Sequence, residues 1–220
     1  MKSNPVYRFA CALGLALAIG GAVPAQADTP KPAAPNAATA APTAPKLHAA
    51  LRSLWQGHVR RTRAYAMAVK AHDAAAADKA AHDVVANATD IANAVGGFYG
   101  DAAGKQMLQL LAGHWGGVKA LTDAGAKGDA AGKQKAMDDL TANGGAIATF
   151  LSGANPNLPK DALLGLLTTH VGHHAAQVDQ IMKGDTQAEA TTWKAMQGHM
   201  DVLADALADG IAKQFPDKAT

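Results

Sequence analysis

The stretch Leu51–His58, which reads LRSLWQGH, returns as MLQLLAGH at Met107–His114 and as LLGLLTTH at Leu163–His170. The distance in sequence from the first copy to the second equals the distance from the second to the third. In every copy large apolar residues and the final histidine fall at spacings of 0, 3, 4 and 7, which mark one face of an α-helix. A unit that recurs every ~56 residues predicts a chain built from copies of one supersecondary structure.

A second helical face follows each of these stretches and recurs at the same step. Its central polar position is Asn87, then Asn143, then His199. The two faces are separated by Lys127-Gly128-Asp129 and Lys183-Gly184-Asp185, where glycine can end one helix and aspartate can cap the next. We therefore predict an all-α fold of six helices, arranged as three tandem helical hairpins that form either a closed bundle or a short stack.

Each predicted turn lies midway between the central histidine of the first helix and the central polar residue of the second. The two side chains are then expected at the same height on antiparallel helices. In the first two hairpins this predicts two buried polar pairs, His58 with Asn87 and His114 with Asn143. Asparagine is a poor ligand for transition metals, so both pairs are interpreted as structural.

The third hairpin differs at one further position of the first helix. Thr62 and Val118 are followed at this position by His174, one helical turn after His170. Imidazoles one turn apart can share a zinc or copper ion, and His199 on the partner helix can supply a third nitrogen. The interpretation of these three histidines as buried structural groups is favoured, and the alternative is that His170, His174 and His199 are metal ligands.

The packing of the hairpins determines whether a second arrangement of histidines is possible. If the hairpins close around a pseudo-threefold axis, His58, His114 and His170 converge at the centre, because neighbouring helices lie about 8–10 Å apart. If the hairpins stack in a row, the outer two histidines are about 20 Å apart and cannot share an ion. Both alternatives are compatible with the sequence.

The first residues have the pattern of a targeting segment. Lys2 and Arg8 flank the apolar stretch 9–23, and Ala25-Gln26-Ala27 has the small residues of a cleavage site. We predict a signal peptide, a proline- and alanine-rich spacer and a three-repeat helical domain at residues 1–27, 28–46 and 47–216. Export to the periplasm or cell envelope is expected, with no transmembrane span after cleavage.

Composition excludes several classes of function. Without Lys2 and Arg8 the chain has 18 basic and 18 acidic residues, so no net charge attracts nucleic acid. The one cysteine, Cys11, lies in the predicted signal peptide, so the mature chain has no thiolate ligand. Glu189 is the one glutamate, which excludes the carboxylate-rich di-iron sites of helical bundles.

Three further stretches of the sequence are distinctive. They are Leu54-Trp55 with His58-Val59 and Thr62-Arg63, Ala142-Asn143 with Ile147-Ala148 and Phe150-Leu151, and Gly210-Ile211 with Lys213-Gln214-Phe215-Pro216. These stretches resemble an uncharacterised family of bacterial exported or envelope proteins with helical repeats. The resemblance covers residues 47–216 and implies an all-helical repeat domain, and it supplies no catalytic residues for this chain. Labels such as acetylglutamate kinase or glycosyltransferase occur in this family, but this chain has no glycine-rich phosphate loop after a strand.

These observations favour a non-enzymatic helical binding or interaction protein without a cofactor. Its partner is then an unknown ligand or a protein of the envelope. The alternative is a transition-metal-binding protein that holds zinc, copper or nickel with the histidines of the third hairpin.

Overall fold

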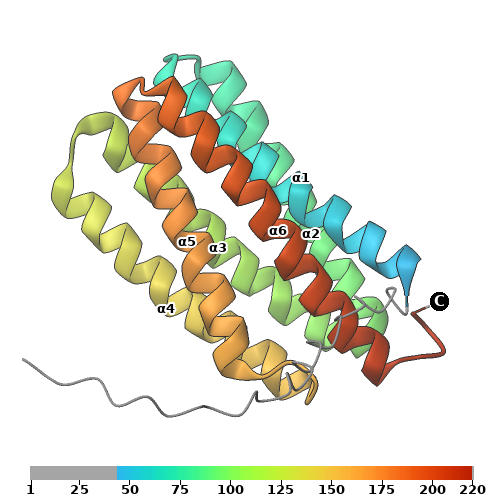
Figure 1. The fold of residues 1–220 in the computed structure, drawn as a ribbon. Coiled ribbons are helices and arrows are strands. Elements are labelled where there is room, and N and C mark those ends of the chain that lie inside the picture. The colour runs from blue at the N-terminus through green and yellow to red at the C-terminus, as the bar shows by residue number, and fades with distance from the viewer. Residues whose placement is uncertain (1–43, 220) are drawn as a thin grey trace, which may run out of the picture. The chain divides into compact units, whose positions relative to one another are not determined.

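The computed structural model describes residues 44–219 of the chain. These residues form six helices that run up and down the molecule (Figure 1), α1 (Pro45–Lys70), α2 (Ala74–Tyr99), α3 (Asp101–Lys127), α4 (Ala130–Ala154), α5 (Lys160–Lys183) and α6 (Thr186–Gln214). The predicted all-α fold of six helices is therefore confirmed for this part of the chain. Within the same residues, no helix combines the length and the apolar character that crossing a membrane requires.

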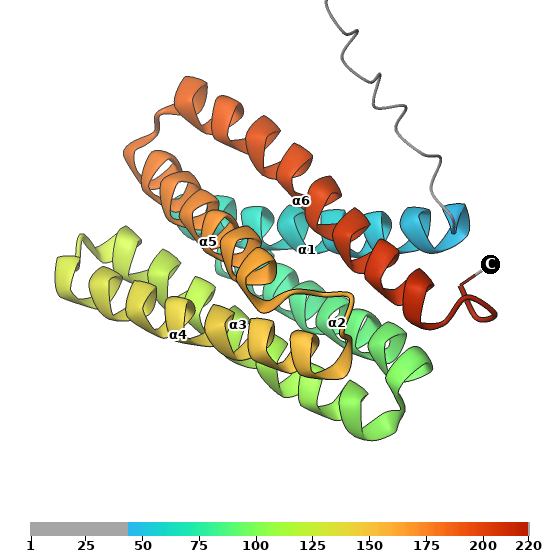
Figure 2. The same ribbon diagram turned by 60° about the horizontal axis from the view of Figure 1, so that its bottom comes forward.

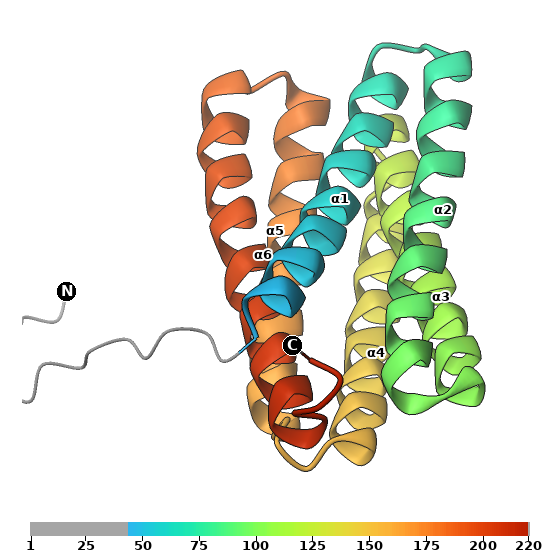
Figure 3. The ribbon, with the colours of Figure 1, turned by 90° about the vertical axis from the view of Figure 1, so that its right-hand side faces the viewer.

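The turns within the hairpins lie where glycine and aspartate predict them. Gly128 and Gly184 end α3 and α5 with φ of 66° and 74°, in the left-handed region that glycine adopts without strain. Asp129 and Asp185 then cap α4 and α6, each accepting a hydrogen bond from the amide three residues later, at 2.9 and 3.0 Å. In Figure 3 the α1–α2 and α5–α6 turns lie at one end of the bundle, and the α2–α3 and α4–α5 connections lie at the other.

The six helices close into a bundle, so the alternative of hairpins stacked in a row is excluded. Every helix packs against its neighbour in the chain, and α1 also packs against α6. Helices α1, α3 and α5 contact one another and form the inner layer. Each outer helix contacts two of the inner ones; Figures 1 and 2 both show α5 between α4 and α6. The first helices of the three hairpins thus surround one common axis.

Polar contacts between α1 and α6 join the first helix to the last. Arg63 donates two hydrogen bonds to the buried carboxylate of Glu189, at 2.7 and 2.8 Å. Toward the other end of α1, His48 contacts Asp205 at 2.8 Å and Asp209 at 3.0 Å. The two-bond contact of Arg63 with Glu189 is directional, so it helps to specify the register of α1 against α6.

The apolar core has two parts, and the histidines lie between them. On α3, Leu111 belongs to the larger cluster of buried apolar residues and Val118 belongs to the smaller one. His114 comes between these two residues in the chain. On α5 the same order holds from Leu167 in the larger cluster to Val178 in the smaller one. Helices α3 and α5 therefore place histidines at the boundary between the two apolar clusters.

Candidate metal centre

Four histidines from the three inner helices meet at the centre of the bundle. His58 lies on α1, His114 on α3, and His170 and His174 lie one turn apart on α5. Their exposed fractions are 3%, 4%, 2% and 2%. One nitrogen from each ring can be chosen so that all four lie within 4.8 Å of one another. Closure of the bundle therefore brings the three central histidines together and adds His174 as a fourth.

The spacing of the rings is close to that of four imidazoles around one tetrahedral ion. With a metal–nitrogen distance of about 2.0–2.1 Å, such imidazoles have ring centroids about 5.2 Å apart. Five of the six centroid distances here are between 5.4 and 5.8 Å. The sixth, between His170 and His174, is 4.4 Å. Small movements and rotations of the rings would therefore bring four nitrogens into a tetrahedron.

Hydrogen bonding leaves several ring nitrogens of this cluster available. The Nε2 atoms of His170 and His174 are 3.1 Å apart, so one ring donates to the other. Among the described residues 44–219, no hydrogen-bond partner is found for His58 Nε2, for either nitrogen of His114, or for His170 Nδ1. A buried polar atom without a partner costs about 1–3 kcal/mol of stability. Ligation of an ion would use such lone pairs.

Burial keeps the four imidazoles in the neutral form that can bind a metal. Loss of solvation lowers the pKa of His58 to about 3 and that of His114 to about 4. It also lowers the pKa of His170 and of His174 well below the usual value, and the neighbouring imidazoles add to the effect. All four rings are then neutral at pH 7, so metal binding would not first require an imidazolium ring to lose a proton.

The central polar residues of the outer helices bind the backbone rather than the histidine rings. The side-chain nitrogens of Asn87, Asn143 and His199 donate to carbonyl oxygens at 3.1, 3.0 and 2.9 Å. In each hairpin the acceptor is the residue four positions before the central histidine. No hydrogen bond joins His58 to Asn87 or His114 to Asn143 within residues 44–219, so the expected pairs are replaced by these contacts with the backbone. Asn143 still lies close enough to His114 to oppose the loss of solvation that lowers the pKa of that ring.

The structure brings together two of the three histidines predicted as metal ligands. His170 and His174 belong to the central cluster, whereas His199 bonds to the carbonyl of Leu166 and its ring centroid is 6.4 Å from that of His170. The other two positions of the cluster are taken by His58 and His114. The sequence indicated this arrangement through histidines at matching positions of the repeats, but only for the alternative in which the hairpins close into a bundle.

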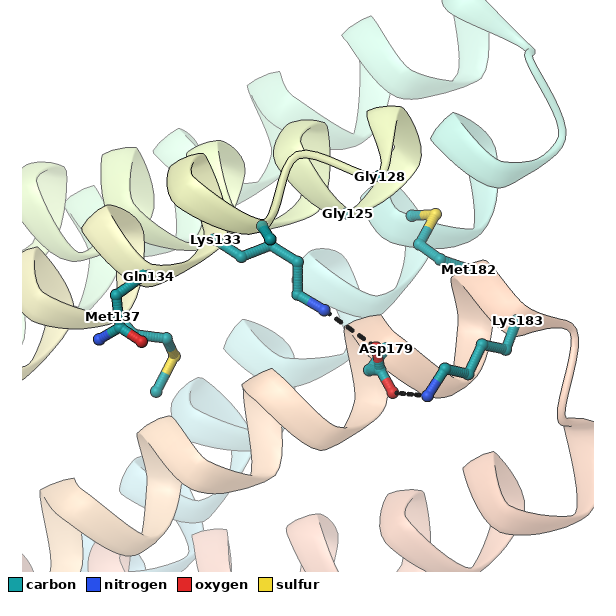
Figure 4. A pocket seen from close by; sticks show the side chains of 9 residues that line it. Gly125, Gly128, Lys133, Gln134, Met137, Asp179, Met182 and Lys183 are labelled. Atoms are coloured by element: carbon teal, nitrogen blue, oxygen red, sulfur yellow. Dashed lines mark hydrogen bonds and ion pairs between the residues drawn. The ribbon is translucent and has the colours of Figure 1, made fainter.

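A surface pocket of about 540 Å³ lies beside the α3–α4 turn and the end of α5 (Figure 4). Its lining includes the apolar side chains of Met137 and Met182. Lys133 and Lys183 also line it, and both form ion pairs with Asp179, at 3.0 and 2.6 Å. Because one carboxylate already serves both ammonium groups, this pocket offers a ligand less specific recognition than the histidine cluster does.

Comparison of the chain with protein-family models, with curated proteins and with solved structures finds no match in any of the three. The family resemblance therefore stays a prediction. The geometry and the protonation of the four histidines are therefore the basis for assigning a function.

Proposed function

We propose that this protein is a non-enzymatic metal-binding helical bundle, and that His58, His114, His170 and His174 hold one divalent transition-metal ion. The observation that carries the proposal is the approach of four buried imidazole nitrogens to within 4.8 Å of one another. A structural role alone would leave several of these nitrogens without partners, at a cost in stability. Metal binding would use the lone pair of one nitrogen in each ring.

Zinc is the ion that this arrangement fits best. Imidazole nitrogen is a good ligand for zinc, copper and nickel, but the three ions differ in preferred geometry. Copper(II) and nickel(II) favour planar or tetragonal sites, whereas zinc favours a tetrahedron. Ring centroids at 5.4–5.8 Å in five of the six pairs support the tetrahedral alternative.

The number of ligands supports a binding role rather than catalysis. Catalytic zinc sites keep one coordination position for water or substrate, and structural sites fill all four with protein atoms. Here four histidines are present and none is more than 4% exposed. We infer a site that retains an ion, either to stabilise the fold or to store the metal.

Export to the periplasm or cell envelope belongs to the same proposal. Its support is the sequence pattern of residues 1–27, which lie outside the described residues. Histidine ligands suit an oxidising compartment, because they do not form the disulfides that would remove thiolate ligands there. The three central histidines occupy matching positions of the hairpins, and we attribute this to a tandem repeat of one hairpin unit.

Equilibrium dialysis of the mature chain against zinc, copper and nickel tests the proposal. About one tightly bound ion per chain is expected at micromolar metal, with zinc raising the thermal unfolding temperature. His114→Ala should lose this ion, and His82→Asn, which changes an exposed histidine of α2, should keep it. Less than one ion per chain, or equal binding by the two variants, would overturn the proposal.

A further inference from the structure

Two more histidines lie beside the central cluster, closer to the surface. His173 on α5 and His199 on α6 are both partly exposed, and their ring centroids are 5.3 Å apart. His199 in turn stacks against His170 of the central cluster, with centroids 6.4 Å apart and planes at 17°. A row of imidazoles therefore leads from partly exposed positions to the buried cluster.

Each ring of this pair has a nitrogen that can serve as a ligand. Nε2 of His199 donates to the carbonyl of Leu166 at 2.9 Å, so in the neutral ring the lone pair is on Nδ1. A hydrogen bond from the second ring nitrogen to a carbonyl is the usual way in which a ligating histidine is oriented. Nδ1 of His173 is buried and has no hydrogen-bond partner within residues 44–219.

The separation of the two rings also fits a shared ion. Two imidazoles bound to one tetrahedral ion have centroids about 5.2 Å apart. The observed distance is 5.3 Å, with an angle of 62° between the ring planes. Both residues are partly exposed, so water could fill the remaining coordination positions of such an ion. A site with two histidines and water would bind an ion more weakly, and exchange it more rapidly, than four buried histidines would.

We propose that His173 and His199 form a second transition-metal site, at which a divalent ion binds before it moves to His170 and the central cluster. The transfer part rests on the proposed function, whereas the second site does not. The four central rings are at most 4% exposed, so an ion needs a path to reach them. Each move along the row exchanges one neutral imidazole or water ligand for another, without a redox step.

The test uses His199→Asn and His173→Gln in the metal-free mature chain. Asparagine stands at the matching positions 87 and 143, where it donates to the same kind of carbonyl, so His199→Asn keeps the backbone contact and removes the ligand. His82→Asn is the matched control. Cobalt(II) is the probe, because its visible absorption reports tetrahedral nitrogen coordination, and stopped-flow mixing measures the rate of loading.

The wild type and the control are expected to bind a tight ion and a weaker second ion. Both variants should keep the tight ion and lose the weaker one. Loading should be at least about tenfold slower, because its rate depends on occupancy of the two-histidine site, and even an outer-shell change commonly lowers metal affinity by about 10–100-fold. Unchanged stoichiometry and rate in both variants would overturn the inference. A wild type with only the weaker ion would contradict the proposed function and the transfer, and would leave the two-histidine site in place.

Discussion

The first two hairpins and the third share one framework but differ in the groups they bring to the axis. At matching positions α1, α3 and α5 each supply a central histidine, and a side chain of the following helix bonds to a carbonyl one turn before it. The third hairpin adds His174 where the others have Thr62 and Val118, and His199 where they have asparagine. Two positions thus give the third hairpin imidazoles that the first two hairpins lack.

This difference accounts for the arrangement of the proposed metal site within a symmetric bundle. Three equivalent helices place three imidazoles around an axis, which leaves a fourth corner of a tetrahedron open. His174 fills that corner from the helix that already carries His170, one turn further along. Symmetry therefore accounts for three of the nitrogens, and a local exception in the third hairpin accounts for the fourth.

The largest expected effect is a loss of folding stability in acid. The first two hairpins contribute to it through His58 and His114. Their pKa values in the folded chain, about 3 and about 4, are below the ordinary 6.5, so the unfolded chain takes up protons first. Stability is therefore complete above about pH 6.5 and is lost as the pH falls toward the folded pKa values. At about pH 5 each of the two rings should lower the free energy of unfolding by about 2 kcal/mol relative to neutral pH.

Urea unfolding of the metal-free chain at neutral and acid pH measures this loss. The double variant His58→Leu with His114→Leu should be less sensitive to acid than the wild type, and His82→Asn should behave as the wild type does. Equal acid sensitivity of the double variant and the wild type would show that the central rings are not buried in neutral form.

The second prediction concerns the position that separates the third hairpin from the first. His174→Thr installs the residue of the matching position 62 and removes one ligand. Loss of an outer-shell partner already lowers metal affinity by about 10–100-fold, so loss of a ligand should cost at least about a hundredfold, or about 2.7 kcal/mol. Competition with a zinc chelator measures the affinity. Thr62→Val, the control in the first hairpin, should leave it within about twofold; equal affinities of the two variants would contradict the assignment.

The sequence predicts the fold well because its signals are local and repeated. Gly128 and Gly184 with the aspartates that follow them define two turns through backbone preferences alone, and both turns are present. The apolar spacing of 3 and 4 residues predicts each helix face without knowledge of its neighbours. Fold class therefore depends on patterns that lie within one hairpin.

The candidate site was only partly predictable, because it depends on how the hairpins pack. His170 and His174 could be paired from their spacing on one helix. His58 and His114 join them only if α1, α3 and α5 surround one axis, and that choice is made by contacts such as Arg63 with Glu189, 126 residues apart. His199 lies outside the central cluster for a related reason, since its ring donates to the backbone carbonyl of Leu166.

A smaller effect is expected at the contact that all three hairpins share. Asn143→Ala removes the hydrogen bond to the carbonyl of Leu110 and leaves a small cavity, so it should lower the free energy of unfolding by about 1–2 kcal/mol. Asn143→His introduces the residue of the third hairpin, where His199 donates to a carbonyl at the matching position. This change should therefore lower the free energy of unfolding by less than Asn143→Ala does. Denaturant unfolding of both variants compares them. Equal losses would mean that the hydrogen bond itself contributes little.

The smallest expected effect is at the turn of the first hairpin, where His72 stands at the position of Gly128 and Gly184. Its φ of 57° is in the left-handed region, which costs a residue with a side chain about 1 kcal/mol. His72→Gly removes this strain but gives the unfolded chain more freedom, so a net gain of about 0.5 kcal/mol is expected. Gly128→Ala, the reverse change in the second hairpin, should lose about 1 kcal/mol. Thermal unfolding of the two variants gives both signs; a loss in His72→Gly would mean that the imidazole makes a stabilising contact in the turn that outweighs its backbone strain.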